Sequence, residues 1–346
     1  MTLRVILRLT PSENLKNRPA WYSKQTCLRS LLAAVRTARE AGFSVEFLVF
    51  IDVSSGRQLS PGVAQLLTDA DAIMPLYGGT AAKSWRPVVR TVRASVPFDD
   101  DDLLYFIEDD YLHHPEALLR LLDGTADYRL LYVPEDENFA TGPLHGGWAA
   151  VDTSTSSFAV TGKAFRKDAA MHLFFSHGGG AWDELCWRAL GSRVCPPRWL
   201  PYVLQPFSRA SQWSRKWGLR PVRHAVFRML ALSHATRRSR AIEVRLPMPA
   251  THGEQSLLAS GSDWSALADS ITAAEKISEK QPAPSASTQP LTDIHPEGDA
   301  PDRLAVRLVA RCDSGLESAL ARAIAPGSAV SMTVSDGAAA LRRTPG

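Results

Sequence analysis

The spacing of apolar residues predicts a strand, a helix and a second strand within the first fifty residues. Residues 3–9 place apolar side chains at every second position, which is the period of a β-strand. Residues 26–41 place them at helical spacing, and Gly42 follows as a typical helix stop. Residues 45–53 form an apolar run that is typical of a buried strand.

The same alternation of strands and helices continues to about residue 135. The pattern predicts a short helix at 61–69, a strand at 72–77, a helix at 81–95, a strand at 103–108, a helix at 115–122 and a strand at 128–133. Alternating elements with short connections are typical of a mostly parallel sheet with helices on both faces. The sequence therefore predicts an α/β fold for this part of the chain.

The pattern changes after residue 135. A strand at 157–161 and a helix at 181–190 are expected there, within a stretch rich in Gly, Ser, Thr and His. Residues 281–303 have the Pro-, Ser-, Thr- and Asp-rich composition of a linker. We therefore expect three parts: an α/β half at 1–135, an irregular and partly helical half at 136–265, and a linker with a disordered C-terminal tail at 266–346.

Composition narrows the class of protein. Apolar residues make up 45% of the chain and charged residues 22%, which is enough apolar surface for a folded core. The 39 Lys and Arg residues nearly balance the 36 Asp and Glu residues, so a dedicated nucleic-acid binder is not expected. The four cysteines are scattered without a CxxC pair, which favours a reducing cytoplasm over a disulfide framework or a zinc site. Neither a membrane-spanning run nor a secretory signal is expected from the apolar segments.

Acidic residues follow two of the predicted strands. Asp52 ends the second strand, and Glu108, Asp109 and Asp110 follow the fourth. Ligands of open parallel sheets bind at the carboxyl ends of the strands. Three adjacent acids repel one another unless a cation compensates them, and carboxylates suit Mg²⁺ or Mn²⁺, which also bind diphosphate oxygens. A solvated acidic turn is the alternative, and it is our interpretation of residues 99–102.

These features resemble the nucleotide-sugar-binding half of a GT-A-fold glycosyltransferase of the family 2 type. The resemblance spans residues 3–200 and rests on Asp52 and on Tyr-Phe-Ile-Glu-Asp-Asp-Tyr after the fourth strand, where Glu-Asp-Asp is a variant of the Asp-x-Asp motif. It implies a GT-A-like (Rossmann-like) sheet, a nucleotide-diphosphate sugar donor, and Mn²⁺ or Mg²⁺ as cofactor. It also implies that residues 1–135 are the nucleotide-sugar-binding half and residues 136–265 the acceptor-side half. The second strand departs from the family pattern, with Asp-Val-Ser-Ser-Gly in place of Asp-Asp-Gly-Ser, which leaves the base contact and the nucleotide open.

The resemblance also implies a role for each residue at these strand ends. Asp110 would bind the metal ion, and Glu108 and Asp109 would contact the ribose or the donor sugar. Asp52 would hydrogen-bond the base, and Thr10, at the end of the first strand, would line the base pocket.

A carboxylate near a glycine-rich loop is the candidate general base. Inverting transfer needs a base on the acceptor hydroxyl, and the superfamily places it at the start of a helix after such a loop. The segment His-Gly-Gly-Gly-Ala-Trp-Asp-Glu fits this description, with Asp183 as the first choice and Glu184 as the second. An ordinary helix start is the alternative, because Asp is a favoured N-cap.

Members of the superfamily often complete the metal shell with a downstream histidine. The candidates are His177, His224, His234 and His252. We prefer His252, because an expected loop after two prolines would let it fold back over the site.

Residues 207–245 contain ten Lys or Arg and a single acid. Three interpretations of this segment are open. It is a solvated face, or it neutralises diphosphate on the donor or on a lipid-linked acceptor. Alternatively, it contacts anionic lipid, with Trp213, Trp217 and Phe227 as aromatic anchors. We favour a phosphate or peripheral membrane role over nucleic acid, because no recognition motif for nucleic acid accompanies the charge.

The sequence thus predicts a metal-dependent, inverting glycosyltransferase of the hexosyltransferase type, in the cytoplasm or at the inner membrane face. Its acceptor would be a carbohydrate or a lipid-linked molecule. A sugar-phosphate nucleotidyltransferase is an alternative, although no Gly-x-Gly-Thr-Arg type loop follows the first strand. A catalytically silent nucleotide- or sugar-binding protein is another.

Overall fold

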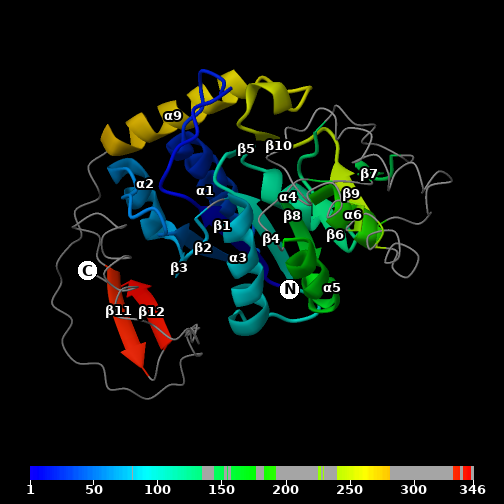
Figure 1. Ribbon diagram of the computed structural model, residues 1–346. Coiled ribbons are helices and arrows are strands. Elements are labelled where there is room, and N and C mark those ends of the chain that lie inside the picture. Colours follow the sequence, from blue (N-terminus) through cyan, green and yellow to red (C-terminus); the bar gives the residue numbers. More distant parts are fainter. Residues whose placement is uncertain are drawn as a thin grey trace, which may run out of the picture.

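A mixed sheet of eight strands forms the centre of the part of the chain that the structure describes (Figure 1). The strands are β1 (Leu3–Leu9), β2 (Val45–Asp52), β3 (Ala72–Leu76), β4 (Leu103–Glu108), β6 (Tyr128–Leu130), β7 (Trp148–Ala150), β8 (Phe158–Thr161) and β9 (Ile242–Arg245). Their spatial order is β3-β2-β1-β4-β8-β6-β9-β7. The strands β1 to β4 are parallel to one another, and β6 is parallel to β9. β8 runs antiparallel to β4 and β6, and β7 runs antiparallel to β9.

Two antiparallel ladders complete the described strands. They join β5 (Tyr111–His113) to β10 (Ala250–His252), and β11 (Val330–Ser335) to β12 (Ala338–Arg343). The computed structural model describes residues 1–79, 81–134, 144–151, 154, 157–176, 183–191, 225, 226, 229, 240–280, 330–335 and 338–343.

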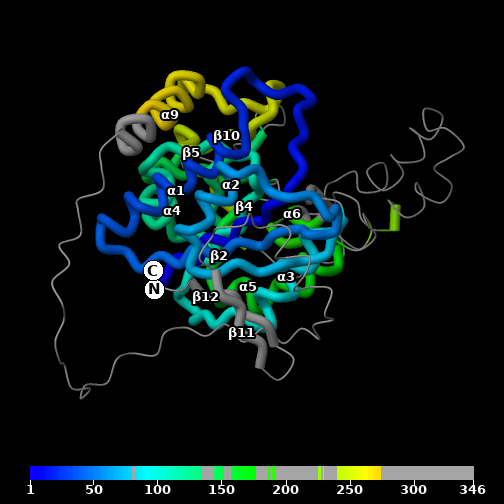
Figure 2. The backbone as a smooth tube through the Cα atoms, turned by 90° about the vertical axis from the view of Figure 1, so that its left-hand side faces the viewer, coloured from blue at the N-terminus to red at the C-terminus, as the bar shows by residue number. Residues whose placement is uncertain are grey.

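Helices cover both faces of the sheet. They are α1 (Lys24–Glu40), α2 (Pro61–Leu66), α3 (Ala81–Ser95), α4 (Ala117–Leu122), α5 (Gly162–Phe175), α6 (Asp183–Gly191) and α9 (Trp264–Lys280), with short 3-10 helices at Leu67–Asp69 and Gln255–Leu257. α1 packs against α2, α4 and α9, whereas α5 packs against α3 and α6. In both views α3 and α5 lie side by side, and α9 lies beside α1 (Figures 1 and 2). The predicted α/β class, with a mostly parallel sheet between two helical layers, is confirmed.

β1 is buried along its whole length although it contains two arginines. Arg4 pairs with Glu46 at 2.9 Å and with Asp102 at 2.5 Å, and Arg8 pairs with Glu108. A buried guanidinium is tolerated when an anionic partner compensates its lost hydration. These pairs therefore allow a strand with an alternating sequence to be covered on both faces.

The sheet continues beyond residue 135, where the alternation in the sequence ends. The predicted elements before that point are present, with ends that shift by a few residues: α1 begins at Lys24, and β6 ends at Leu130. The sequence did not predict β5, β7, β9, β10, α5 or α9, nor the strands β11 and β12, which lie in the tail that was expected to be disordered. Four of these are strands of three or four residues, which are too short to show a period. α9 spans the expected boundary at residue 265, while the division into three parts stays a prediction, and the expected linker at 281–303 lies outside the described residues.

The expectation of a solvated turn at residues 99–102 is wrong for Asp102. This residue is 4% exposed, whereas Asp100 and Asp101 are exposed. One carboxylate oxygen accepts from the backbone N–H of Thr2 at 2.6 Å. The other accepts from Arg4 at 2.5 Å and from the backbone N–H of Asp99 at 2.8 Å. Asp102 therefore ties the start of β1 to the turn before β4.

We predict that Asp102→Asn lowers the free energy of unfolding at pH 7 by about 2–4 kcal/mol, because buried Arg4 loses a charged partner. Burial raises the pKa of Asp102, but the N–H groups of Asp99 and Thr2 and the Arg4 guanidinium outweigh this and lower it. A carboxyl whose pKa folding lowers stabilises the protein above its unfolded pKa of about 3.9, and this contribution is lost as the pH falls through the folded pKa.

Denaturant unfolding at pH 7 and pH 3 measures this difference. The stability gap between wild type and Asp102→Asn is expected to narrow at pH 3. Asp100→Asn is the control, because the Asp100 side chain is 61% exposed. Equal stability of wild type and Asp102→Asn at pH 7 would contradict the assignment.

Candidate functional site

The carboxyl ends of β1 and β4 bring Thr10 next to the acidic motif. β1 and β4 are paired in parallel so that Arg8 lies opposite Glu108, the last residue of β4. Asp109 follows, and its Oδ2 accepts from the backbone N–H of Thr10 at 2.7 Å and from the Thr10 hydroxyl at 3.2 Å. Two of the residues that the sequence assigned to the nucleotide therefore lie in contact.

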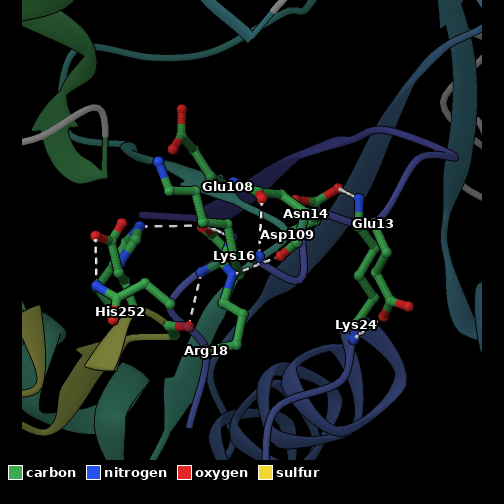
Figure 3. A network of polar contacts seen from close by, with 12 residues as sticks. Glu13, Asn14, Lys16, Arg18, Lys24, Glu108, Asp109 and His252 are labelled. Carbon is green, nitrogen blue, oxygen red and sulfur yellow. Dashed lines mark hydrogen bonds and ion pairs between the residues drawn. The ribbon is translucent and has the colours of Figure 1, made fainter. Parts of the chain in front are cut away.

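Each of the three adjacent acids has its own basic partner. Figure 3 shows this polar network, with Glu108, Asp109, Arg18 and Lys24 labelled. Glu108 pairs with Arg8 of β1. Asp109 pairs with Lys24, the first residue of α1, at 2.5 Å, and Asp110 pairs with Arg18 of the β1–α1 loop at 3.0 Å. The mutual repulsion of the three carboxylates is thus compensated by side chains from a strand, a loop and a helix.

Lys24 is held at the site by the start of α1. The side chain of Ser23 caps the helix by accepting from the backbone N–H of Thr26 at 2.9 Å. The Lys24 ammonium then donates to the backbone carbonyl of Thr10 at 2.5 Å and to its hydroxyl at 2.8 Å, in addition to Asp109. Lys24 therefore joins the end of β1 to the turn after β4.

The β5–β10 ladder brings His252 to Asp110. His252 is paired with Tyr111, and the backbone N–H of Gly253 donates to the carbonyl of Asp110 at 2.7 Å. The Nε2 atom of His252 lies 3.2 Å from Oδ2 of Asp110. The imidazole also contacts the rings of Tyr111 and Tyr132, at centroid distances of 5.1 and 6.4 Å. The two residues that the sequence assigned to a metal ion are therefore neighbours, although 142 positions separate them in the chain.

The charges at Asp110 favour its ionised form. Burial raises the pKa of Asp110, but the hydrogen bonds and charges of His252 and Arg18 outweigh this and hold the pKa well below its usual range. Burial lowers the pKa of His252, and the hydrogen bond and charge of Asp110 outweigh that effect and raise it. Both shifts favour a carboxylate paired with an imidazolium.

Asp110 and His252 can serve as two ligands of a divalent cation once His252 has lost its proton, because a metal ion binds the neutral imidazole. Oδ1 of Asp110 and Nδ1 of His252 are buried without a hydrogen-bond partner among the described residues. No cluster of three or more His, Cys, Asp or Glu that could hold a metal ion occurs in that part of the chain. Mg²⁺ and Mn²⁺ need no larger set of protein ligands when substrate phosphates and water supply the others. The donor set therefore fits the predicted ion.

Both carboxylate oxygens of Asp52 accept hydrogen bonds from the segments that follow β2 and β3. Its Oδ1 accepts from the N–H and hydroxyl of Ser54 at 3.0 and 2.5 Å and from the N–H of Gly78 at 3.2 Å, and Oδ2 accepts from the N–H of Gly79 at 3.0 Å. The residue is 5% exposed. These contacts join the ends of β2 and β3, and the predicted contact with a base stays a prediction. Tyr77, which directly follows β3, is 56% exposed.

The candidate general bases stand at the start of α6, which begins at Asp183. The expected helix start is confirmed, and the side chains of Asp183 and Glu184 lie outside the described ones. The glycine-rich loop before them and most of residues 207–245 also lie outside the described residues. Among the described helices, none combines the length and apolarity needed to cross a membrane.

Sequence reasoning missed the basic half of the site, namely Arg8, Arg18 and Lys24. The signal was present for Arg8, because an arginine within a buried parallel strand needs an acid on a neighbouring strand. Arg18 carried no such signal, because its contact with Asp110 depends on the path of an irregular loop.

Comparison with known proteins gives partial structural overlaps. No protein-family profile and no curated protein matches the chain. The galactosyltransferase LgtC in complex with donor and acceptor sugar analogues overlaps with 82% of this chain and 98% of its own, at 9% identity and a TM-score of 0.38. A 4-diphosphocytidyl-2C-methyl-D-erythritol synthase overlaps with 49% of this chain and 78% of its own, at 13% identity and a TM-score of 0.31. The bifunctional IspDF from Campylobacter jejuni overlaps with 52% of this chain and 48% of its own, at 13% identity and a TM-score of 0.28.

These identities and TM-scores establish neither a family nor an activity for this chain. The fold therefore stands on the strand order and the helical layers described above, and the function has to be argued from the site.

The Arg8–Glu108 pair is predicted to stabilise the fold at the site. Arg8→Met is expected to lower the free energy of unfolding by about 3–5 kcal/mol, because it leaves Glu108 without its buried partner. Glu108→Gln in the same chain is expected to restore part of this loss, with a coupling energy of about 1–3 kcal/mol in a double-mutant cycle.

Denaturant unfolding of the four proteins measures the coupling. Arg166→Met with Asp100→Asn is the matched control cycle, because these partners are 43% and 61% exposed and lie 3.4 Å apart. A coupling between Arg8 and Glu108 no larger than in the control would show that the pair is not compensating the acidic motif.

Proposed function

We propose that this protein is a glycosyltransferase that moves a hexosyl group from a nucleotide-diphosphate sugar to an acceptor hydroxyl. The observation that supports it best is the contact between Asp110 and His252 near the carboxyl ends of the parallel strands β1 and β4. Oδ1 of Asp110 is buried there without a hydrogen-bond partner among the described residues. Open parallel sheets bind ligands at this edge, and a carboxylate–imidazole pair suits a cation that also binds phosphates. Thr10 and Asp109 border the same edge.

Asp110 and His252 would hold Mn²⁺ or Mg²⁺, which supplies positive charge to the diphosphate leaving group. Lys24 keeps Oδ2 of Asp109 in place beside Thr10, on the side of the site where the nucleoside would bind. Tyr77 offers an exposed ring near the ends of β2 and β3 on which a base can stack. To accept a hydrogen bond from the base, as predicted, the carboxylate oxygens of Asp52 would also have to keep their hydrogen bonds from Ser54, Gly78 and Gly79.

Asp183 is the proposed general base. Its carboxylate accepts the proton of the acceptor hydroxyl while the acceptor oxygen bonds to the anomeric carbon. The bond between that carbon and the diphosphate breaks at the same time, the diphosphate leaves with the electron pair, and the configuration inverts. Glu184 is the alternative base, since both residues stand in the first turn of α6.

Nucleotidyl transfer to a sugar phosphate is disfavoured by the loop between β1 and α1. Residues 10–23 contain no glycine, whereas that chemistry calls for a glycine-rich loop after the first strand. A carbohydrate or lipid-linked acceptor, and a peripheral membrane contact through residues 207–245, are proposed on the sequence alone.

The donor site is tested by calorimetric titration of UDP and of GDP, with Mn²⁺ and with a chelator. We expect one of the two nucleotides to bind only with Mn²⁺, and Asp110→Ala to weaken this binding about tenfold or more, as expected for loss of a charged ligand. Asp100→Ala, which removes an exposed acid before β4, should leave binding unchanged. If neither nucleotide binds with or without metal, the proposal is wrong.

The general base is tested by turnover of the donor. Asp183→Asn is expected to lower kcat by about 10²–10⁴-fold, which is the usual contribution of a positioned base, and to leave donor affinity unchanged. Glu184→Gln is the matched comparison, and it should lower kcat much less. A reversed order would assign the base to Glu184, and unchanged rates in both variants would exclude this helix start from catalysis.

A further inference from the structure

Arg18 reaches from the β1–α1 loop to the predicted metal ligand. Its Nη2 donates to Oδ2 of Asp110 at 3.0 Å, and its Nη1 donates to the carbonyl of Gly253 at 2.7 Å. Its Nε donates to the carbonyl of Asn14 at 2.8 Å, and the guanidinium lies 4.3 Å from the centre of the Tyr22 ring. The side chain is 9% exposed, so this placement is well defined by packing and hydrogen bonds.

Arg18 and His252 meet Asp110 at the same carboxylate oxygen. Both approach Oδ2, at 3.0 and 3.2 Å, while Oδ1 is buried without a partner among the described residues. A divalent cation on this carboxylate would lie within a few ångströms of the guanidinium, and the two positive charges would repel each other. Arg18 and the cation therefore compete for Asp110.

The other two basic residues of the motif are fixed differently. Arg8 belongs to the buried strand β1, and the Lys24 ammonium is bonded to the carbonyl and hydroxyl of Thr10 as well as to Asp109. Arg18 instead belongs to an irregular loop and pairs with the acid that the metal ion needs. Its planar fork of N–H groups matches the paired oxygens of a phosphate.

We propose that Arg18 binds the donor diphosphate and that, without a donor, it holds Asp110 in an ion pair that excludes the divalent cation. A diphosphate brings negative oxygens that satisfy both the guanidinium and the cation, so metal and donor enter the site together. This inference rests on the proposed function, because it assigns a residue to the diphosphate of the same site.

The first test is Mn²⁺ binding without nucleotide, followed by electron paramagnetic resonance of the unbound ion. Arg18→Gln is expected to tighten Mn²⁺ binding about tenfold or more, because a positive charge next to the ligand is removed. Arg18→Lys keeps that charge and should stay close to wild type. Lys16→Gln removes an exposed positive charge from the same loop, and it should change the affinity much less.

The second test is calorimetric titration of UDP and GDP at saturating Mn²⁺. Arg18→Gln is expected to weaken nucleotide binding about tenfold, through loss of a charge-assisted contact with phosphate. The two effects therefore have opposite signs: tighter metal binding and weaker diphosphate binding. A purely structural role of Arg18 would weaken both, and that result would overturn the inference.

The outcomes separate this inference from the proposed function. If wild type binds UDP or GDP in a manner that depends on Asp110, while Arg18→Gln changes neither affinity, the function stands and the role of Arg18 is wrong. If wild type binds neither nucleotide, the proposed function fails, and the diphosphate role of Arg18 fails with it.

Discussion

The compensation of three adjacent carboxylates is the constraint on which this site depends. Glu108 ends the buried strand β4, and Asp109 and Asp110 follow it, so that their charges would repel one another in a medium that screens poorly. Each acid pairs with an arginine or a lysine, taken from β1, from the β1–α1 loop and from the start of α1, and Asp110 also contacts His252. The acidic motif, the first strand and the first helix are thereby fixed to one another.

This compensation also changes how the motif meets a metal ion. With three acids paired to three bases, the site has little excess negative charge to attract a divalent cation on its own. Asp110 stands apart, because one of its oxygens is shared by Arg18 and His252 and the other has no partner among the described residues. A charged diphosphate is the kind of ligand that lets such a site accept a cation without expelling its own basic residues.

The parallel half of the fold could be predicted from the sequence, because long strands and helices leave clear periods. The short strands could not be predicted, and His252 shows the consequence. It lies in β10, and the pairing of β10 with β5 brings it to Asp110. Asp102 illustrates another limit, since its sequence neighbours suggest a solvated turn while its partners Thr2 and Arg4 lie about a hundred positions away. Acids at strand ends were visible in the sequence, but their basic partners depend on register and on the path of a loop.

The most direct test of the account is the position of Mn²⁺ in crystals grown with Mn²⁺ and UDP or GDP, located by its anomalous scattering. We expect a Mn²⁺ ion bonded to a carboxylate oxygen of Asp110 and to His252, with the guanidinium of Arg18 in contact with the diphosphate. A nucleotide bound at the sheet edge without such a peak, or a peak away from Asp110, would contradict the assignment of these residues.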